Sequence, residues 1–190
     1  MTRRELVELL AGPFCEEYAR RTAARIGASE ADIALLYDTV ATPDASLPAR
    51  VRHAVAFRGA YVVETLYFAS PERFAPFAER FCRRDFAATT DPSARRHLAK
   101  IMAHLLGSYY PDTEALEAIA ESAAAWAVDP AARPAVKIWA MEVVKKCRTR
   151  IGWVDEAWDD LLATVVRDAP PSIANRLRNS WSGRNRGVKP

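Results

Sequence analysis

A helix-length segment of the same character recurs along this chain about every forty residues. The segments cover residues 49–68, 93–110 and 135–150, and each follows a turn that contains proline. Each carries a basic residue in its first half, with separations of 38 and 41 residues: Arg58, Arg96 and Lys137. A helix pair with this period cannot bury its apolar face alone, so successive pairs stack on one another. The repeat predicts an all-α chain of stacked antiparallel helix pairs.

Local signals support helix nearly everywhere. The chain has only 7 glycines, and alanine, the strongest helix former, is abundant. Ser70 before Pro71 and Asp91 before Pro92 are favoured combinations of an N-cap and a first helical residue. Between the recurring segments lies a second set of predicted helices, at residues 71–87, 113–128 and 153–166.

The N-terminal part is less regular. A helix is predicted for residues 14–26, where Gly27 ends it, and Ser29 resembles the N-cap of a second helix over 30–39. Residues 41–48 have the composition of a loop. We therefore divide the chain into an N-terminal helical pair at 1–47, which is a cap or an irregular first repeat, stacked pairs at 48–181, and a flexible basic tail at 182–190.

The recurring segments resemble the HEAT-repeat α-solenoids, a family of the armadillo type. The third begins Arg133-Pro-Ala-Val-Lys-Ile-Trp-Ala-Met-Glu, which looks like the second helix of a HEAT unit: a proline turn, a basic residue, then small and aliphatic residues. The units are degenerate and lack the regular ladder of Asp and Arg. The resemblance implies a short α-α superhelix with a binding surface on its concave side, formed by inner helices. It does not imply a reaction.

Charged and aromatic residues on the predicted inner helices are the candidate binding residues. One hypothesis is a charged concave surface for an extended or phosphate-bearing partner. The alternative is a set of ion pairs and solvated side chains, each of which contributes little. The candidates are Arg58, Tyr61, Glu64, Arg96, His97, Lys100, His104, Lys137 and Glu142.

No motif in the chain predicts a catalytic, cofactor or metal site. It lacks a glycine-rich phosphate loop, a GxSxG elbow and an HExxH pair. His97 and His104 share one helix stripe, but seven residues place them about 10 Å apart along the axis, too far to share a metal ion. We expect no enzyme activity and no cofactor.

The position of two tryptophans near an aspartate leaves one enzymatic alternative open. One α-solenoid family excises alkylated DNA bases with aromatic residues and an Asp in its concave groove. Trp126, Asp129 and Trp139 invite comparison with that arrangement, although no motif fixes their roles.

Charge, hydropathy and cysteine content limit the kinds of partner and the cellular compartment that we expect. The formal charge is +3, but residues 172–190 hold five basic residues and no acid, which leaves the remainder at −2. No run of 18 apolar residues exists and the first residues do not resemble a signal peptide, so we expect no membrane partner. The isolated Cys15, Cys82 and Cys147 are typical of small buried residues in a reducing cytoplasm.

Three hypotheses of function follow. The first is a non-catalytic interaction module of the cytoplasm with a protein partner. The second is a nucleic-acid-binding solenoid, extending to an enzyme similar to an alkylpurine DNA glycosylase. The third is a self-association unit that pairs through exposed Phe68, Phe74 and Phe77.

Overall fold

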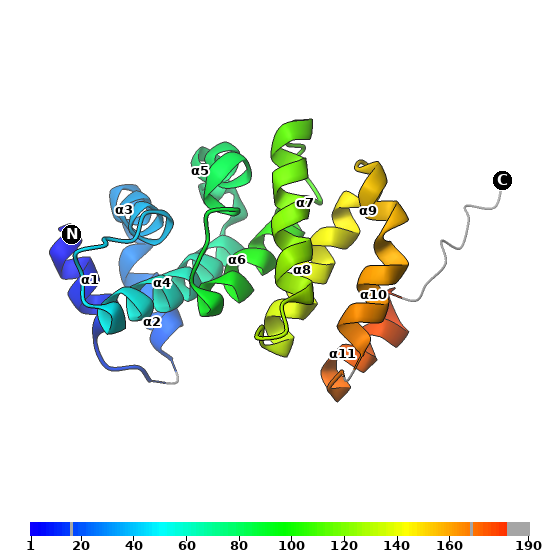
Figure 1. The fold of residues 1–190 in the computed structure, drawn as a ribbon. Coiled ribbons are helices and arrows are strands. Elements are labelled where there is room, and N and C mark those ends of the chain that lie inside the picture. The colour runs from blue at the N-terminus through cyan, green and yellow to red at the C-terminus, as the bar shows by residue number, and fades with distance from the viewer. Residues whose placement is uncertain (16, 168, 182–190) are drawn as a thin grey trace.

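The computed structural model describes residues 1–181 except 16 and 168, and within these residues it is all-helical (Figure 1). None of the described helices combines the length and the hydropathy that a membrane span requires. The prediction of an all-α fold is confirmed. The elements are α1 (Arg3–Ala11), α2 (Tyr18–Ile26), α3 (Glu30–Ala41), α4 (Ala49–Ala69), η1 (Pro71–Phe74), α5 (Ala75–Arg80), η2 (Phe81–Asp85), α6 (Pro92–Leu105), α7 (Thr113–Val128), α8 (Pro134–Cys147), α9 (Gly152–Glu156), α10 (Trp158–Val166), α11 (Pro171–Arg176) and η3 (Leu177–Trp181).

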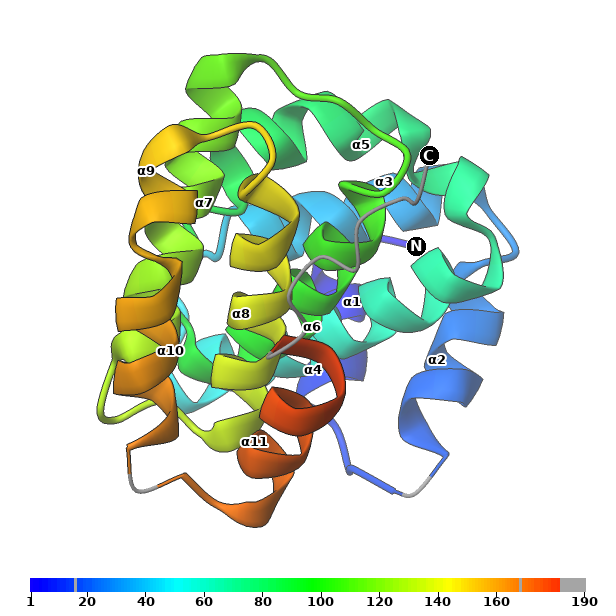
Figure 2. The ribbon, with the colours of Figure 1, turned by 90° about the vertical axis from the view of Figure 1, so that its right-hand side faces the viewer.

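The helices form two layers. In the first, α4 packs on α6, α6 on α8, and α8 on α11. In the second, η2 packs on α7 and α7 on α10, while α3 and α7 each lie against a helix of the first layer. Figures 1 and 2 show α4, α6 and α8 in succession, with α3, α5, α7 and α10 on their outer side. We call α4, α6, α8, α11 and η3 the inner layer, and α3, η1, α5, η2, α7, α9 and α10 the outer layer.

Side-chain caps place several helix starts where the sequence predicts them. Ser29 accepts a hydrogen bond from the backbone N–H of Asp32, and Asp91 accepts two, from Ser93 and Ala94. Asp112 caps α7 through the N–H of Ala115. These contacts satisfy N–H groups that have no partner within the helix.

Three segments differ from the predicted helices: residues 1–47, residues 71–87, and residues 153–166, which are divided at Ala157 into α9 and α10. Residues 1–47 hold three helices instead of two, because Thr2 and Glu5 form a capping box that starts α1. Ser70 makes no side-chain cap, and the predicted helix 71–87 is divided into η1, α5 and η2. Pro76 accounts for the first division, because proline lacks the N–H that a continuous helix would use.

Aromatic side chains join the outer layer into one core. Phe81 contacts Phe74 and Phe86 edge to face, with ring centroids 5.4 and 5.8 Å apart. Phe86 in turn lies 4.6 Å from the ring of Trp126 on α7. Because Phe74 is buried, the proposed role for it in an exposed self-association surface is wrong, whereas Phe68 is 40% exposed.

Gly59 allows α3 to approach α4 closely. A Cβ at this position would lie 2.5 Å from Cγ2 of Val40, whose branched side chain is stiff. We expect Gly59→Ala to lower the free energy of unfolding by about 1–3 kcal/mol, because overpacking outweighs the gain in helix propensity. Gly152→Ala is the matched control, because nothing lies within 4 Å of its added Cβ. Urea denaturation of both variants measures the contrast, and a Gly59→Ala protein as stable as Gly152→Ala would contradict it.

The three cysteines differ in accessibility. Cys82 and Cys147 are buried, and burial raises the pKa of each thiol to about 12. Cys15 is exposed, so the prediction that all three are buried is wrong for this residue. A thiol reagent such as DTNB at pH 8 is expected to label one cysteine in the folded protein and three in denaturant, because the thiolate is the reactive form. Rapid labelling of more than one thiol under native conditions would contradict this burial.

Candidate binding surface on the inner layer

Charge is segregated between the two layers. The inner layer carries eleven basic and two acidic residues, and the outer layer carries four basic and thirteen acidic residues. The inner basic residues are Arg50, Arg52, Arg58, Arg95, Arg96, Lys100, Lys137, Lys145, Lys146, Arg176 and Arg178, and the acids are Glu64 and Glu142. The near-neutral net charge of residues 1–171 therefore conceals a strongly positive layer and a negative layer behind it. The positive layer attracts anions.

Glu64 of α4 is the centre of a buried polar cluster. Its Oε2 atom lies 2.5 Å from Nδ1 of His97, and its Oε1 atom lies 2.5 Å from Nζ of Lys100. Tyr61 stacks on the His97 ring, with centroids 4.8 Å apart and planes 23° from parallel. The structure thus brings together four of the candidate residues from α4 and α6.

The Glu64 carboxylate is held in its charged form. Burial raises its pKa, but the hydrogen bonds from His97 and Lys100 and their positive charge outweigh burial, so the net pKa lies below the ordinary value of 4.5. Removing both partners would leave the carboxylate buried without compensation. The cluster therefore locks α4 against α6 and fixes the side chains around it.

This lowered pKa predicts a dependence of stability on pH. A carboxyl group with a depressed folded-state pKa contributes stability above its unfolded pKa, and that contribution is lost as pH falls below about 4.5. We expect Glu64→Gln to be less stable than wild type at pH 7, with a difference that shrinks between about pH 5 and pH 3. Glu121→Gln, at an exposed site on α7, is the control. Thermal denaturation measures both, and an undiminished difference at pH 3 would contradict the charged cluster.

Glu142, the second inner acid, is also neutralised within the protein. Its Oε1 atom accepts from Nε1 of Trp181 at 3.1 Å and lies 3.4 Å from the guanidinium of Arg176. Ser180 donates its hydroxyl to the same oxygen at 3.3 Å. These contacts join η3 and α11 to α8. Neither inner acid is therefore left to oppose the remaining cations.

Cations and aromatic rings alternate across the inner layer. Nζ of Lys100 lies 4.7 Å from the ring centroid of Phe68 on α4 and 5.6 Å from that of Trp139 on α8. The guanidinium of Arg176 lies 5.5 Å from the same Trp139 ring. Such contacts between cations and ring faces are attractive. We call this continuous set the inner row: Tyr61, Glu64, Phe68, His97, Lys100, Trp139, Glu142 and Arg176.

Several inner cations have no partner within residues 1–15, 17–167 and 169–181. Arg96 on α6 and Lys146 on α8 are exposed and form no ion pair or hydrogen bond with the described residues. The same holds for Arg50 at the start of α4 and for Arg178 in η3. Lys146 is close to the turn that follows α6, since its Nζ lies 3.9 Å from the position that a Cβ would take at Gly107. These residues are charged, accessible and free to bind an anion.

Two basic candidates are placed away from the inner row. Arg58 donates hydrogen bonds to the backbone carbonyls of Leu10 and Gly12, so it fastens the end of α1. Lys137 precedes Trp139 by two residues, and about 100° of rotation per residue puts it on the opposite side of α8. His104 is exposed beside the row, where its Nδ1 lies 2.7 Å from the Tyr67 hydroxyl.

The residues compared with a base-excision site do not converge. Trp126 is 4% exposed and lies against Phe86 under the guanidinium of Arg95. Asp129 ends α7 and lies 3.9 Å from the same guanidinium. Trp139 belongs to the inner row instead. Trp126 is therefore a core residue that has no free face for a base.

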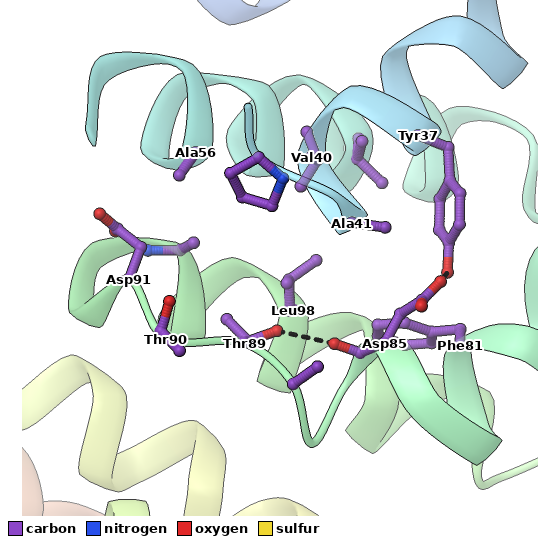
Figure 3. A pocket seen from close by; sticks show the side chains of 14 residues that line it. Tyr37, Val40, Ala41, Ala56, Phe81, Asp85, Thr89, Thr90, Asp91 and Leu98 are labelled. Carbon is purple, nitrogen blue, oxygen red and sulfur yellow. Dashed lines mark hydrogen bonds between the residues drawn. The ribbon is translucent and has the colours of Figure 1, made fainter. Parts of the chain in front are cut away.

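A cleft of about 540 Å³, surrounding solvent space included, lies between α3, α4, η2 and α6 (Figure 3). Its walls are mainly apolar, and both of its carboxylates already have partners. Asp85 accepts a hydrogen bond from Tyr37 at 2.9 Å and pairs with two arginines, Arg80 and Arg84. Asp91 is occupied by the cap of α6 and by His53 at 2.6 Å. This cleft therefore offers no free carboxylate for chemistry.

Sequence reasoning missed part of the inner row. Phe68, Trp139 and Arg176 were not among its candidate binding residues. The spacing of Trp139 and Glu142 is a signal that could have found Trp139, since residues three apart share one helix face. Among the described residues, no three His, Cys, Asp or Glu side chains are grouped so that they could hold a metal ion.

Comparison with known proteins gives no relative from which a role could be transferred. No protein-family model, no curated protein and no solved structure matches this chain.

Proposed function

We propose that this protein is a non-catalytic interaction module, built as a short HEAT-like stack, whose inner layer binds an extended polyanion. The observation that carries the proposal is the charge of the inner layer: its helices hold eleven basic residues, of which the exposed Arg96 and Lys146 have no partner among the described residues, and its two acids are already neutralised inside the protein. Cations on successive helices suit a partner with regularly repeated negative charge.

The arrangement does not favour an enzyme. Glu64, His97 and Lys100 form a cluster with acid and base groups, but His97 is 2% exposed and Glu64 is 7% exposed. A substrate atom would have to come within about 3 Å of such a group for proton transfer. The glycosylase hypothesis loses its aromatic platform at Trp126, which is buried. A binding role does not require that a ligand contact the buried Glu64 or His97.

Salt-dependent binding of polyanions tests the proposal. The purified chain is titrated with fluorescein-labelled polyglutamate, a 20-nucleotide single strand and a 20-base-pair duplex at ~50 mM and ~200 mM salt, and fluorescence anisotropy is recorded. We expect at least one of these polyanions to bind at ~50 mM and to lose affinity steeply at ~200 mM, because several counterions are released on binding. Polylysine is the control of opposite charge. Absence of binding to every polyanion at the lower salt would contradict the proposal.

A further inference from the structure

We infer that the polyanion bound by the inner layer is a single-stranded nucleic acid. This inference rests on the proposed function and adds the class of partner to it. The feature that carries it is the alternation of partly exposed aromatic rings with cations along the inner row. A polyanion with planar groups can use both kinds of side chain, whereas an acidic peptide uses only the cations.

Each of the helices α4 and α8 offers an aromatic ring that solvent can reach. Phe68 is 40% exposed at the end of α4, and Tyr61 and Trp139 are partly exposed on the same face of the layer. By contrast, Trp126, Trp158 and Trp181 are each at most 4% exposed. The aromatic rings of the inner row are therefore distinct from those that build the core.

The cations lie over the faces of these rings. Lys100 and Arg176 are 5.6 and 5.5 Å from the centroid of the Trp139 ring. A base that stacks on Trp139 would take the place of one of these long side chains on the ring face, and the displaced cation would then be close to the phosphates of the same strand. The unpaired Arg96 and Lys146 extend the positive surface along α6 and α8.

A duplex fits this surface less well than a single strand. In a duplex the bases are stacked on one another, so the rings of the inner row would meet no free base face. Every unpaired base has a free aromatic face, whatever its identity, so stacking tolerates any sequence. We therefore expect broad recognition of single strands, with little dependence on base identity.

Competition between partners and a matched pair of tryptophan variants test the inference. Anisotropy is measured at ~50 mM salt with fluorescein-labelled (dT)20, its 20-base-pair duplex and polyglutamate, for wild type, Trp139→Leu and Trp153→Leu. Trp153 is the control because it is also partly exposed but lies on α9, where its Nε1 bonds to Glu117 at 3.1 Å. Intrinsic fluorescence is recorded in the same titrations, because a stacked base quenches the indole.

We expect (dT)20 to bind more tightly than the duplex and polyglutamate, and to quench wild-type fluorescence. Trp139→Leu should weaken (dT)20 binding about 10-fold, leave polyglutamate binding unchanged and remove most of the quenching. Trp153→Leu should do none of this. A duplex or polyglutamate that binds as tightly as (dT)20, or a Trp139→Leu protein with unchanged affinity, would overturn the single-strand inference while the polyanion proposal stands. Failure of all three probes to bind would overturn both.

Discussion

The double variant Arg96→Glu, Lys146→Glu is expected to bind its polyanion about 100-fold more weakly than wild type. Both side chains are exposed, lie on adjacent helices of the inner layer, and have no ion pair among the described residues. Each lost phosphate contact also removes about one released counterion, so the slope of log affinity against log salt should fall by about two.

A second double charge reversal, outside the inner layer, separates the loss of these two contacts from a change in net charge. Arg4→Glu, Arg167→Glu changes the formal charge by the same amount, with Arg4 on α1 and Arg167 directly after α10. We expect this control to bind within about twofold of wild type at ~150 mM salt, because neither residue belongs to the inner layer and salt screens charges that do not contact the partner. Circular dichroism should show that both proteins remain folded. An equal loss of affinity in the two proteins would mean that net charge, and not the inner layer, attracts the partner.

Phe86→Ala is expected to lower the free energy of unfolding by about 3–5 kcal/mol, the largest effect on stability that we predict. The side chain is fully buried between η2 and α7, where it contacts Phe81 and Trp126. Its removal leaves a cavity between two rings that cannot collapse without moving a helix. The loss should be visible as a lower urea midpoint.

Phe14→Ala is the control for this truncation. Phe14 is 51% exposed, so the same atoms are removed from a site that is already in contact with water. We expect it to cost less than about 1 kcal/mol, in line with most surface substitutions. Comparable destabilisation by the two variants would contradict the placement of Phe86 in the core that joins the outer helices.

Helix positions were predictable from the sequence because their signals are local. Asp91 before Pro92 starts α6 through two backbone hydrogen bonds, and Ser29 starts α3 through one. These signals need no knowledge of neighbouring helices.

The direction of each charged side chain was not predictable, because it depends on the preceding helix pair. Arg58 and Arg96 occupy similar positions in their repeats, yet Arg58 turns to the free carbonyls of Leu10 and Gly12, and Arg96 stays in solvent. A free acceptor at the end of α1 makes the difference. Lys137 shows a second cause. It lies two residues before Trp139 on α8, and two residues of helix rotation place it on the opposite side of that helix.

The net charge of a segment does not show where its charged residues lie in the fold. The sequence assigned the positive charge to the tail, since the remaining residues total −2. Summation discards position, and the described helices place basic residues in one layer and acidic residues in the other. Arg176 and Arg178 of the basic segment belong to the inner layer, whereas the predicted tail at 182–190 lies outside the described residues.

Protection of lysines from acetylation tests the central claim most directly. The chain has five lysines, and Lys146 and Lys137 lie on one helix but on opposite sides of it. Labelling with an acetylating reagent and mass spectrometry, with and without a saturating polyanion, gives the rate at each residue. If the inner layer is the binding surface, bound polyanion will slow acetylation of Lys146 and leave Lys137 unchanged. Equal slowing of both lysines, or no slowing of Lys146 when the polyanion is bound, would contradict the account.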